Sequence, residues 1–307
     1  MQQSAAGRNK GNEWRGCIVK YIDKADFQIS NTCVAFGRFD GMHIGHRAVI
    51  GKLLETSKRG LASVVVSFDS RDEQEKILTT TEEKQELLRE NGPEVLISYA
   101  VDKQGFSLES FVKEVLVDKL DVKVLVTGKN DSNLPALREL SEKYGFSVEE
   151  IETVNADGEP VTSERIAKEI AQGSLQKATE MLGHPYLLMG EVMHGKALGR
   201  TVGMPTANLG VGENKLIPRH GVYATLSTME GESYKGLTNI GLRPSVDSYQ
   251  YVTIETYLLN FAKDIYGKKI KLEVQGFIRE VQKFDNLEEV KKQVEKDLEY
   301  VKKNVKQ

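Results

Sequence analysis

The sequence predicts two domains: an α/β half with a mainly parallel sheet, then an antiparallel β-barrel with a C-terminal helix. The chain has 307 residues, which is enough for two ordinary domains. Short apolar runs alternate with helical patterns up to about residue 150, whereas apolar strands separated by Gly-rich turns dominate after Pro185. We therefore expect one domain over residues 14–183 and a second over residues 184–307.

In the first half, strands and helices alternate in the order that is typical of a parallel sheet covered by helices. Buried strands are predicted at 32–36, 61–68, 95–101 and 122–128. Amphipathic helices are predicted at 46–60, 81–91 and 107–120. The segment 134–151 closes this series, and two short helices broken at Gly173 lead out of the domain over 161–183.

The second half reads as strands followed by one helix. Strands are predicted at 220–229, 233–241, 251–260 and 269–280. Asn286 is the predicted N-cap of the last helix, with Glu289 completing a capping box. We expect the barrel to be covered by the apolar stripe of this helix, namely Leu287, Val290, Val294, Leu298, Val301 and Val305.

The composition is that of a soluble folded protein. Hydrophobic residues make up 39% and charged residues 28% of the chain, and the formal net charge is −3. This charge argues against a nucleic-acid binder, and the apolar runs are too short to span a membrane. The two cysteines, Cys17 and Cys33, make no disulfide framework and fit a reducing compartment. No signal peptide is visible, so we expect a cytoplasmic protein; its oligomeric state stays open.

The first chemical motif is the stretch GRFDGMHIGH, which starts at Gly37 and lies between a predicted strand and a predicted helix. Glycines let the backbone approach a phosphate, and the helix N-terminus favours an anion. We expect His43 and His46, together with Asp40, to form a nucleotide-phosphate site, with the imidazoles donating to developing negative charge. The alternative is a surface turn with two unrelated histidines.

The second motif is GEVMHGKALGRTVGMPTANL at 190–209. Its glycines and cations predict a loop that holds ATP phosphates, formed by Gly195, Lys196, Gly199, Arg200 and Gly203. Thr206 and Asn208 lie two apart in an extended segment, so that their oxygens share one side and suit Mg²⁺. A generic Gly-rich turn is the alternative.

A third candidate is Glu255 in the strand YVTIETYLL. Strand alternation places its carboxylate on the same face as Thr253 and Tyr257. A carboxylate there is suited to accept a proton from an alcohol that attacks a phosphate. The alternative is an exposed strand glutamate with no role in chemistry.

These motifs resemble those of a known family. FDGMHIGH resembles the HxGH motif of Rossmann-like nucleotidyltransferases and is most similar to bacterial FAD synthetases, which adenylylate FMN. The PTAN tetrapeptide resembles riboflavin kinase, as do IPRHGVYAT, LTNIGLRPSV and the Glu255 strand that follow it. The chain thus resembles the prokaryotic bifunctional riboflavin kinase/FAD synthetase family. The resemblance implies that Mg²⁺, ATP and riboflavin are bound, that FMN is the product, and that Glu255 is the catalytic base.

The N-terminal half departs from the family pattern. Ser70, Arg71 and Asp72 stand where the family has Pro-His-Pro, while Glu164 replaces a hydroxyl and Ala167 an arginine that binds the triphosphate. A carboxylate in that place repels a triphosphate, and the lost guanidinium removes a bidentate contact.

We therefore hypothesise that adenylyl transfer to FMN is weak, altered or absent. Two alternatives remain: a fully bifunctional enzyme that also makes FAD, and a non-enzymatic regulator that senses flavin nucleotides. The sequence leaves open whether Arg38 compensates for Ala167 by reaching the phosphates.

Overall fold

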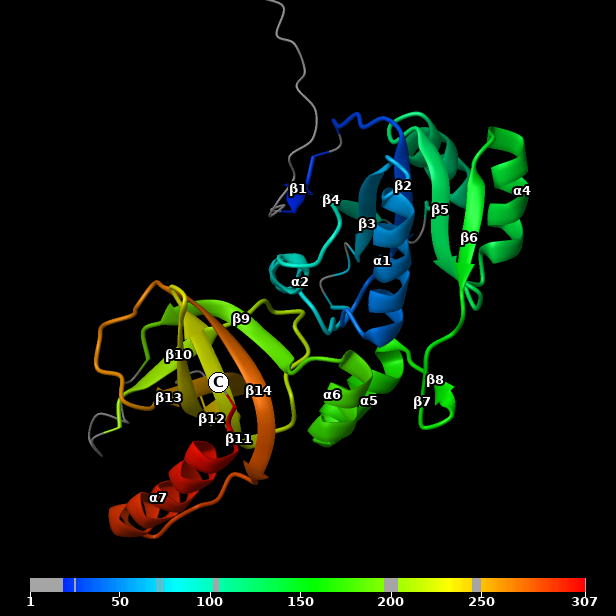
Figure 1. The fold of residues 1–307 in the computed structure, drawn as a ribbon. Coiled ribbons are helices and arrows are strands. Elements are labelled where there is room, and N and C mark those ends of the chain that lie inside the picture. Colours follow the sequence, from blue (N-terminus) through cyan, green and yellow to red (C-terminus); the bar gives the residue numbers. More distant parts are fainter. Residues whose placement is uncertain are drawn as a thin grey trace, which may run out of the picture.

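The computed structural model describes residues 19–24, 26–70, 72, 74–101, 105–195, 204–244 and 250–306. Within these residues, the chain forms an α/β domain and a closed β-barrel, which lie side by side in Figure 1. The predicted fold class is confirmed: a parallel sheet in the first half, and an antiparallel barrel with a C-terminal helix in the second.

The sheet of the first domain is parallel at every pairing and has the order β1-β4-β3-β2-β5-β6 within the described residues. Its strands are β1 (Lys20–Ile22), β2 (Thr32–Gly37), β3 (Ala62–Ser70), β4 (Val95–Val101), β5 (Val122–Gly128) and β6 (Ser147–Ile151). The connecting helices are α1 (Ile44–Ser57), α2 (Thr81–Leu88), α3 (Leu108–Phe111), which continues as the π-helix η1 (Val112–Val117), and α4 (Leu134–Tyr144).

Both faces of this sheet are covered, which is why its strands read as continuous apolar runs. Successive residues of a strand face opposite sides: Val34 packs with η1 and α4, whereas Cys33 and Ala35 pack with Ile50 and Leu53 of α1. The sequence did not predict β1 or β6. Gly145, with φ of +77°, ends α4, and the rest of segment 134–151 turns back as β6.

The order of the strands reverses at β2, because β3 pairs on one side of it and β5 on the other. In open parallel sheets, ligands bind beyond the carboxyl ends of the strands at such a reversal. The motif at Gly37–His46 begins there, so the fold places it where a nucleotide site belongs.

A six-stranded antiparallel barrel follows, ordered β10-β13-β12-β11-β14-β9 and closed by the pairing of β9 with β10, as far as the structure is described. Its strands are β9 (Tyr186–Met193), β10 (Thr206–Gly210), β11 (Gly221–Met229), β12 (Glu232–Pro244), β13 (Gln250–Leu258) and β14 (Lys269–Arg279). The sequence analysis did not delimit β9 or β10, since each is short or interrupted by glycine.

Two short strands and two helices connect the sheet to the barrel. The short strands β7 (Asn155–Ala156) and β8 (Glu159–Pro160) form a small ladder that the sequence did not predict. The helices α5 (Ser163–Gln172) and α6 (Leu175–Leu182) are separated at Gly173, as expected, and α6 contacts β9 and β14. In Figure 1 these two helices lie below α1, beside the barrel.

The last helix, α7 (Leu287–Asn304), begins where expected: Asn286 accepts a hydrogen bond from the N–H of Glu289 at 3.0 Å. Its predicted stripe is only partly correct. Val301 and Val305 are buried against β11 and β12, but Leu287 is 61% exposed. The helix therefore covers the barrel with its C-terminal half, and its first turn lies outside that contact.

Candidate active sites

The turn after β2 is held in an unusual backbone shape by buried side chains. Phe39 and Met42 have φ values of +47° and +44°, and their side chains are buried in the α1-side core. Such positive φ values are costly for residues with a side chain and persist only where packing fixes them. Between them, the carboxylate of Asp40 accepts hydrogen bonds from the N–H groups of Leu78 (3.1 Å) and Thr79 (2.9 Å). Asp40 therefore anchors the segment that precedes α2.

The two predicted histidines meet at the start of α1. Their rings stack with centroids 3.6 Å apart, and Nδ1 of His43 accepts the N–H of His46 at 3.3 Å. Burial lowers the pKa of both imidazoles, that of His43 to about 4, so both are neutral at neutral pH. Nδ1 of His46 is buried without a hydrogen-bond partner among the described residues, which leaves a ring nitrogen for a ligand.

A pocket of about 180 Å³ lies beside this turn. It is lined by Arg38, Asp40, Glu75, Lys76, Leu78, Ser163, Glu164, Ala167 and Leu216. The cations in it are engaged: Arg38 forms an ion pair with Glu75 at 2.7 Å, and Nζ of Lys76 donates to the carbonyl of Glu213 at 2.7 Å. Glu164 lies near enough to counteract the lowering of the His43 pKa.

One buried cation near the histidines was missed in the sequence. Nζ of Lys84 donates to Asp69 (3.0 Å) and to the hydroxyl of Ser67 (2.8 Å), and its charge helps to lower the pKa of His46 after burial and His43. Asp69 also accepts from Thr81 and Ser98. The strong N-cap of α2 is the sequence signal that fixes the position of this lysine.

In the barrel, strand register brings the other candidates together. Asn208 of β10 is the direct partner of Glu255 on β13, and Thr206 is the partner of Tyr257. Directly opposite residues have side chains on the same face. Thr206, Asn208 and Glu255 therefore share one face of the barrel wall, while Ala207 and Thr256 between them are buried.

Gly195 lies against this face. A Cβ on Gly195 would stand 2.2 Å from Nδ2 of Asn208, closer than real Cβ contacts come. A side chain at position 195 would therefore displace the Asn208 amide, and glycine leaves that amide its room. The other predicted phosphate-loop residues, Lys196, Gly199, Arg200 and Gly203, lie outside the described residues.

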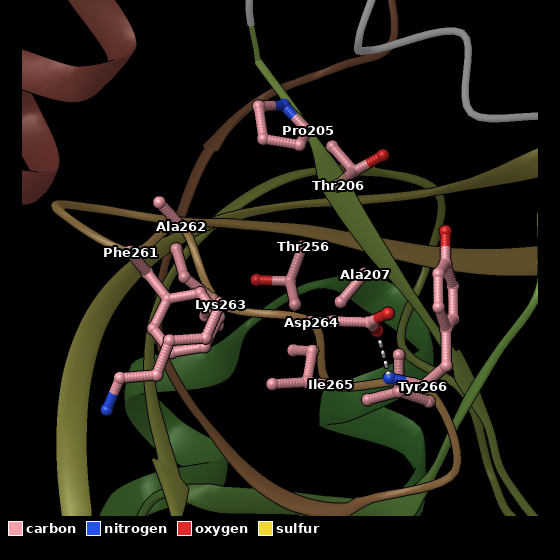
Figure 2. A pocket seen from close by; sticks show the side chains of 12 residues that line it. Pro205, Thr206, Ala207, Thr256, Phe261, Ala262, Lys263, Asp264, Ile265 and Tyr266 are labelled. Atoms are coloured by element: carbon pink, nitrogen blue, oxygen red, sulfur yellow. Dashed lines mark hydrogen bonds between the residues drawn. The ribbon is translucent and has the colours of Figure 1, made fainter.

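A larger pocket, of about 420 Å³, opens next to Thr206 (Figure 2). Its walls come from β10, β13 and the loop before β14, and include Thr256, Phe261 and Tyr266. The ring of Tyr266 stacks on His194 with centroids 3.9 Å apart. A mostly apolar slot with a few polar groups suits a flat base such as adenine. Sequence reasoning missed this pocket because the loop 259–268 shows no periodicity.

Further along β12 and β13, and just after β14, three apolar side chains are exposed. Leu242 and Val252 are direct cross-strand partners and are 50% and 41% exposed, and Val281 is 52% exposed. Arg279, at the end of β14, forms an ion pair with the buried Asp297 of α7 at 2.8 Å. The guanidinium of Arg279 is therefore engaged by α7.

The fold is that of a two-domain protein in which an α/β domain, with a motif at the reversal of its strand order, is joined to a closed antiparallel barrel. Comparison with known families agrees. The family model for riboflavin kinase matches residues 182–305, and the one for FAD synthetase matches residues 26–165.

Curated relatives span nearly the whole chain. A bifunctional riboflavin kinase/FMN adenylyltransferase of Listeria monocytogenes is 33% identical, covering 87% of this chain and 90% of the relative. One of Escherichia coli (strain K12) is 33% identical, covering 86% and 90%. The chain therefore belongs to the bifunctional riboflavin kinase/FMN adenylyltransferase family, and its barrel is a riboflavin kinase domain.

A solved structure shares the fold of the whole chain. It is described as a macrolide-efflux protein from Streptococcus pneumoniae, and it matches with a TM-score of 0.80 at 24% identity, covering 93% of this chain and 99% of that one.

Among the described residues, none of the helices is both long and apolar enough for a membrane crossing.

Proposed function

We propose that the barrel transfers the γ-phosphate of ATP to the terminal ribityl hydroxyl of riboflavin, giving FMN and ADP, and that the N-terminal domain adenylylates FMN weakly or not at all. One observation carries the first part: the β10–β13 register sets Thr206, Asn208 and Glu255 on one face. That face has oxygen donors for a metal and a carboxylate for a proton, which a phosphoryl transfer to an alcohol requires.

Each part of the site then has a role. Thr206 and Asn208 are hard oxygen donors that fit Mg²⁺, and the missing side chain of Gly195 leaves room for the Asn208 amide in its present position. Bound Mg²⁺ would offset charge on the phosphates. The pocket beside Thr206 takes the adenine, and the exposed Leu242, Val252 patch faces an apolar ring such as that of a flavin.

The chemical step itself needs one base. Glu255 accepts the proton of the ribityl hydroxyl while the hydroxyl oxygen forms a bond to the γ-phosphorus. The bond between the γ-phosphorus and the oxygen that bridges the β- and γ-phosphates breaks. ADP leaves with the electron pair of that bond. The site then works by holding the hydroxyl in line with the phosphate, which is the main source of rate in such transfers.

The charges of the N-terminal pocket support weak adenylyl transfer. Arg38 could have replaced the triphosphate contact that is lost at Ala167, but its guanidinium is paired with Glu75. Glu164 lines the same pocket and adds its carboxylate to those of Asp40 and Glu75 where a triphosphate would lie. The stacked histidines and their buried ring nitrogen favour the other candidate, a fully bifunctional enzyme.

A product assay tests both parts. The protein is incubated with riboflavin, ATP and Mg²⁺, and the flavins are separated by chromatography. We expect FMN without appreciable FAD; FMN followed by FAD at a comparable rate refutes the second part, and unchanged riboflavin refutes the first and favours a flavin sensor. Glu255→Gln should lower kcat by about 10²–10⁴, the usual range for a general base. A wild-type kcat in that variant would exclude Glu255 from the proton transfer.

A further inference from the structure

A buried ion pair joins the two domains. The side chains of Glu83, on α2, and Lys215, in the segment after β10, are both 0% exposed, and Nζ of Lys215 lies 2.6 Å from Oε2 of Glu83. The same ammonium donates to the carbonyl of Leu78 and lies 4.3 Å above the ring of Tyr186. A buried charged pair is tolerated only when its hydrogen-bonding capacity is met, and here it is met from both domains.

The second oxygen of Glu83 holds the barrel at another point. Oε1 accepts the N–H of Met189 in β9 at 3.0 Å. The pairing of β10 with β9 ends at Gly210, opposite Glu191, so the N–H of Met189 lies beyond the end of that ladder. The carboxylate of Glu83 therefore takes a place that a strand partner would otherwise fill.

These contacts meet at one end of the β9–β10 pair, where β9 begins and β10 ends; this end is called the base of the pair. β9 leads to Gly195, β10 carries Thr206 and Asn208, and Glu83 bonds to β9 through Met189 and to the continuation of β10 through Lys215. Tyr186, at the start of β9, closes the base by donating its hydroxyl to the carbonyl of Leu216 at 2.6 Å. Met189 lies four residues from Met193, the direct partner of Asn208, which is about 13 Å along a strand.

We propose that Glu83 of the N-terminal domain is a positioning residue for phosphoryl transfer in the barrel, because its carboxylate fixes the base of the β9–β10 pair. The inference rests on the proposed kinase function. It gives the N-terminal domain a role in FMN formation that is independent of adenylyl transfer. The proposed metal ligands Thr206 and Asn208 lie on β10, which pairs with β9, whereas the apolar patch at Leu242 and Val252 lies at the β12–β13 pairing.

The test compares substitutions in the full-length chain. Glu83→Gln alone leaves Lys215 buried with a weakened partner and is expected to lose stability, so the double variant Glu83→Gln with Lys215→Met is made as well. Replacing both charges of a buried pair is often neutral for stability. The single amide oxygen of Gln cannot serve the N–H groups of both Thr80 and Met189 as the carboxylate does.

We expect the double variant to raise KM for Mg·ATP roughly tenfold while KM for riboflavin stays within about twofold. Amide hydrogen exchange should become faster in β9 and β10 and stay unchanged in β11. The matched control is Lys269→Met, which removes an exposed pair with Glu82 at the same interface and should leave all three readouts at wild-type values.

A folded double variant with wild-type KM for Mg·ATP and wild-type exchange in β9 and β10 overturns the inference. An equal rise of both KM values also overturns it, because a general loss of stability would then be the cause. If the wild-type protein leaves riboflavin unchanged, the proposed function fails instead. Hydrogen exchange and equilibrium binding of Mg²⁺ with a non-hydrolysable ATP analogue still decide whether Glu83 holds the strand pair.

Discussion

Gly195→Ala tests the metal site through a single added methyl group. The new Cβ would lie 2.2 Å from Nδ2, 2.7 Å from Cγ and 2.9 Å from Oδ1 of Asn208, while ordinary contacts begin near 3.4 Å. The Asn208 amide must therefore move by about 1 Å. Because the atoms that clash end a flexible side chain, the amide rotates away at a cost of about 0.5–1.5 kcal/mol, and the barrel stays folded. Its oxygen, however, leaves the position proposed for the metal.

A displacement of about 1 Å in a catalytic group lowers rates by up to about 10²-fold. We therefore expect Gly195→Ala to raise the Mg²⁺ concentration for half-maximal FMN formation by roughly 10- to 100-fold, with a thermal midpoint close to that of the wild type. Gly212→Ala is the control, since its Cβ meets nothing closer than 3.5 Å. A wild-type Mg²⁺ dependence in a folded Gly195→Ala protein would refute the proposed role of Asn208.

Two further predictions concern the N-terminal domain. The pKa of His43 is about 4 in the folded protein against about 6.5 in an unfolded chain, so the unfolded state binds more protons between these values. The free energy of unfolding should fall by up to about 3 kcal/mol as the pH drops from 7 to 4. Urea titrations of His43→Gln at several pH values should show a smaller dependence of this free energy on pH. The same pH dependence in the variant and the wild type would contradict the role given to His43. Glu164→Thr combined with Ala167→Arg should increase FAD formation from FMN at least about tenfold, because it removes a carboxylate from the pocket and adds a guanidinium. FAD formation that stays at the level of the unmodified protein would show that charge in this pocket is not what limits adenylyl transfer.

Most elements of this fold could be predicted because helix and strand patterns depend on residues that are close in the sequence. The strand at β2 and helix α1 followed from an apolar run and a 3.6-residue period, and Asn286 was identified as a cap from the glutamate three residues on. Leu287 shows the limit of such reasoning. It continues the apolar stripe of α7, yet it is exposed, because periodicity indicates which face is apolar and not how far the partner surface extends.

The site could be predicted in part for the same reason. Thr206 and Asn208 share a face by strand alternation alone, but their proximity to Glu255 depends on a register between β10 and β13 that local sequence does not contain. Lys215 and Glu83 are 132 residues apart, and each reads as an ordinary surface charge. Only the packing of the two domains turns them into a buried pair.

The segment from Glu75 to Glu83 lines the N-terminal pocket and also contacts the barrel. Glu75 pairs with Arg38, the backbone at Leu78 holds Asp40, and Glu83 holds Lys215 of the barrel. Charges that a triphosphate would require are thus committed to contacts within the domain and across the interface. If this segment is retained because it docks the barrel, selection on the segment persists even when adenylyl transfer is weak. The N-terminal domain then remains necessary for efficient FMN formation, although the carboxylates of its own pocket repel a nucleotide triphosphate.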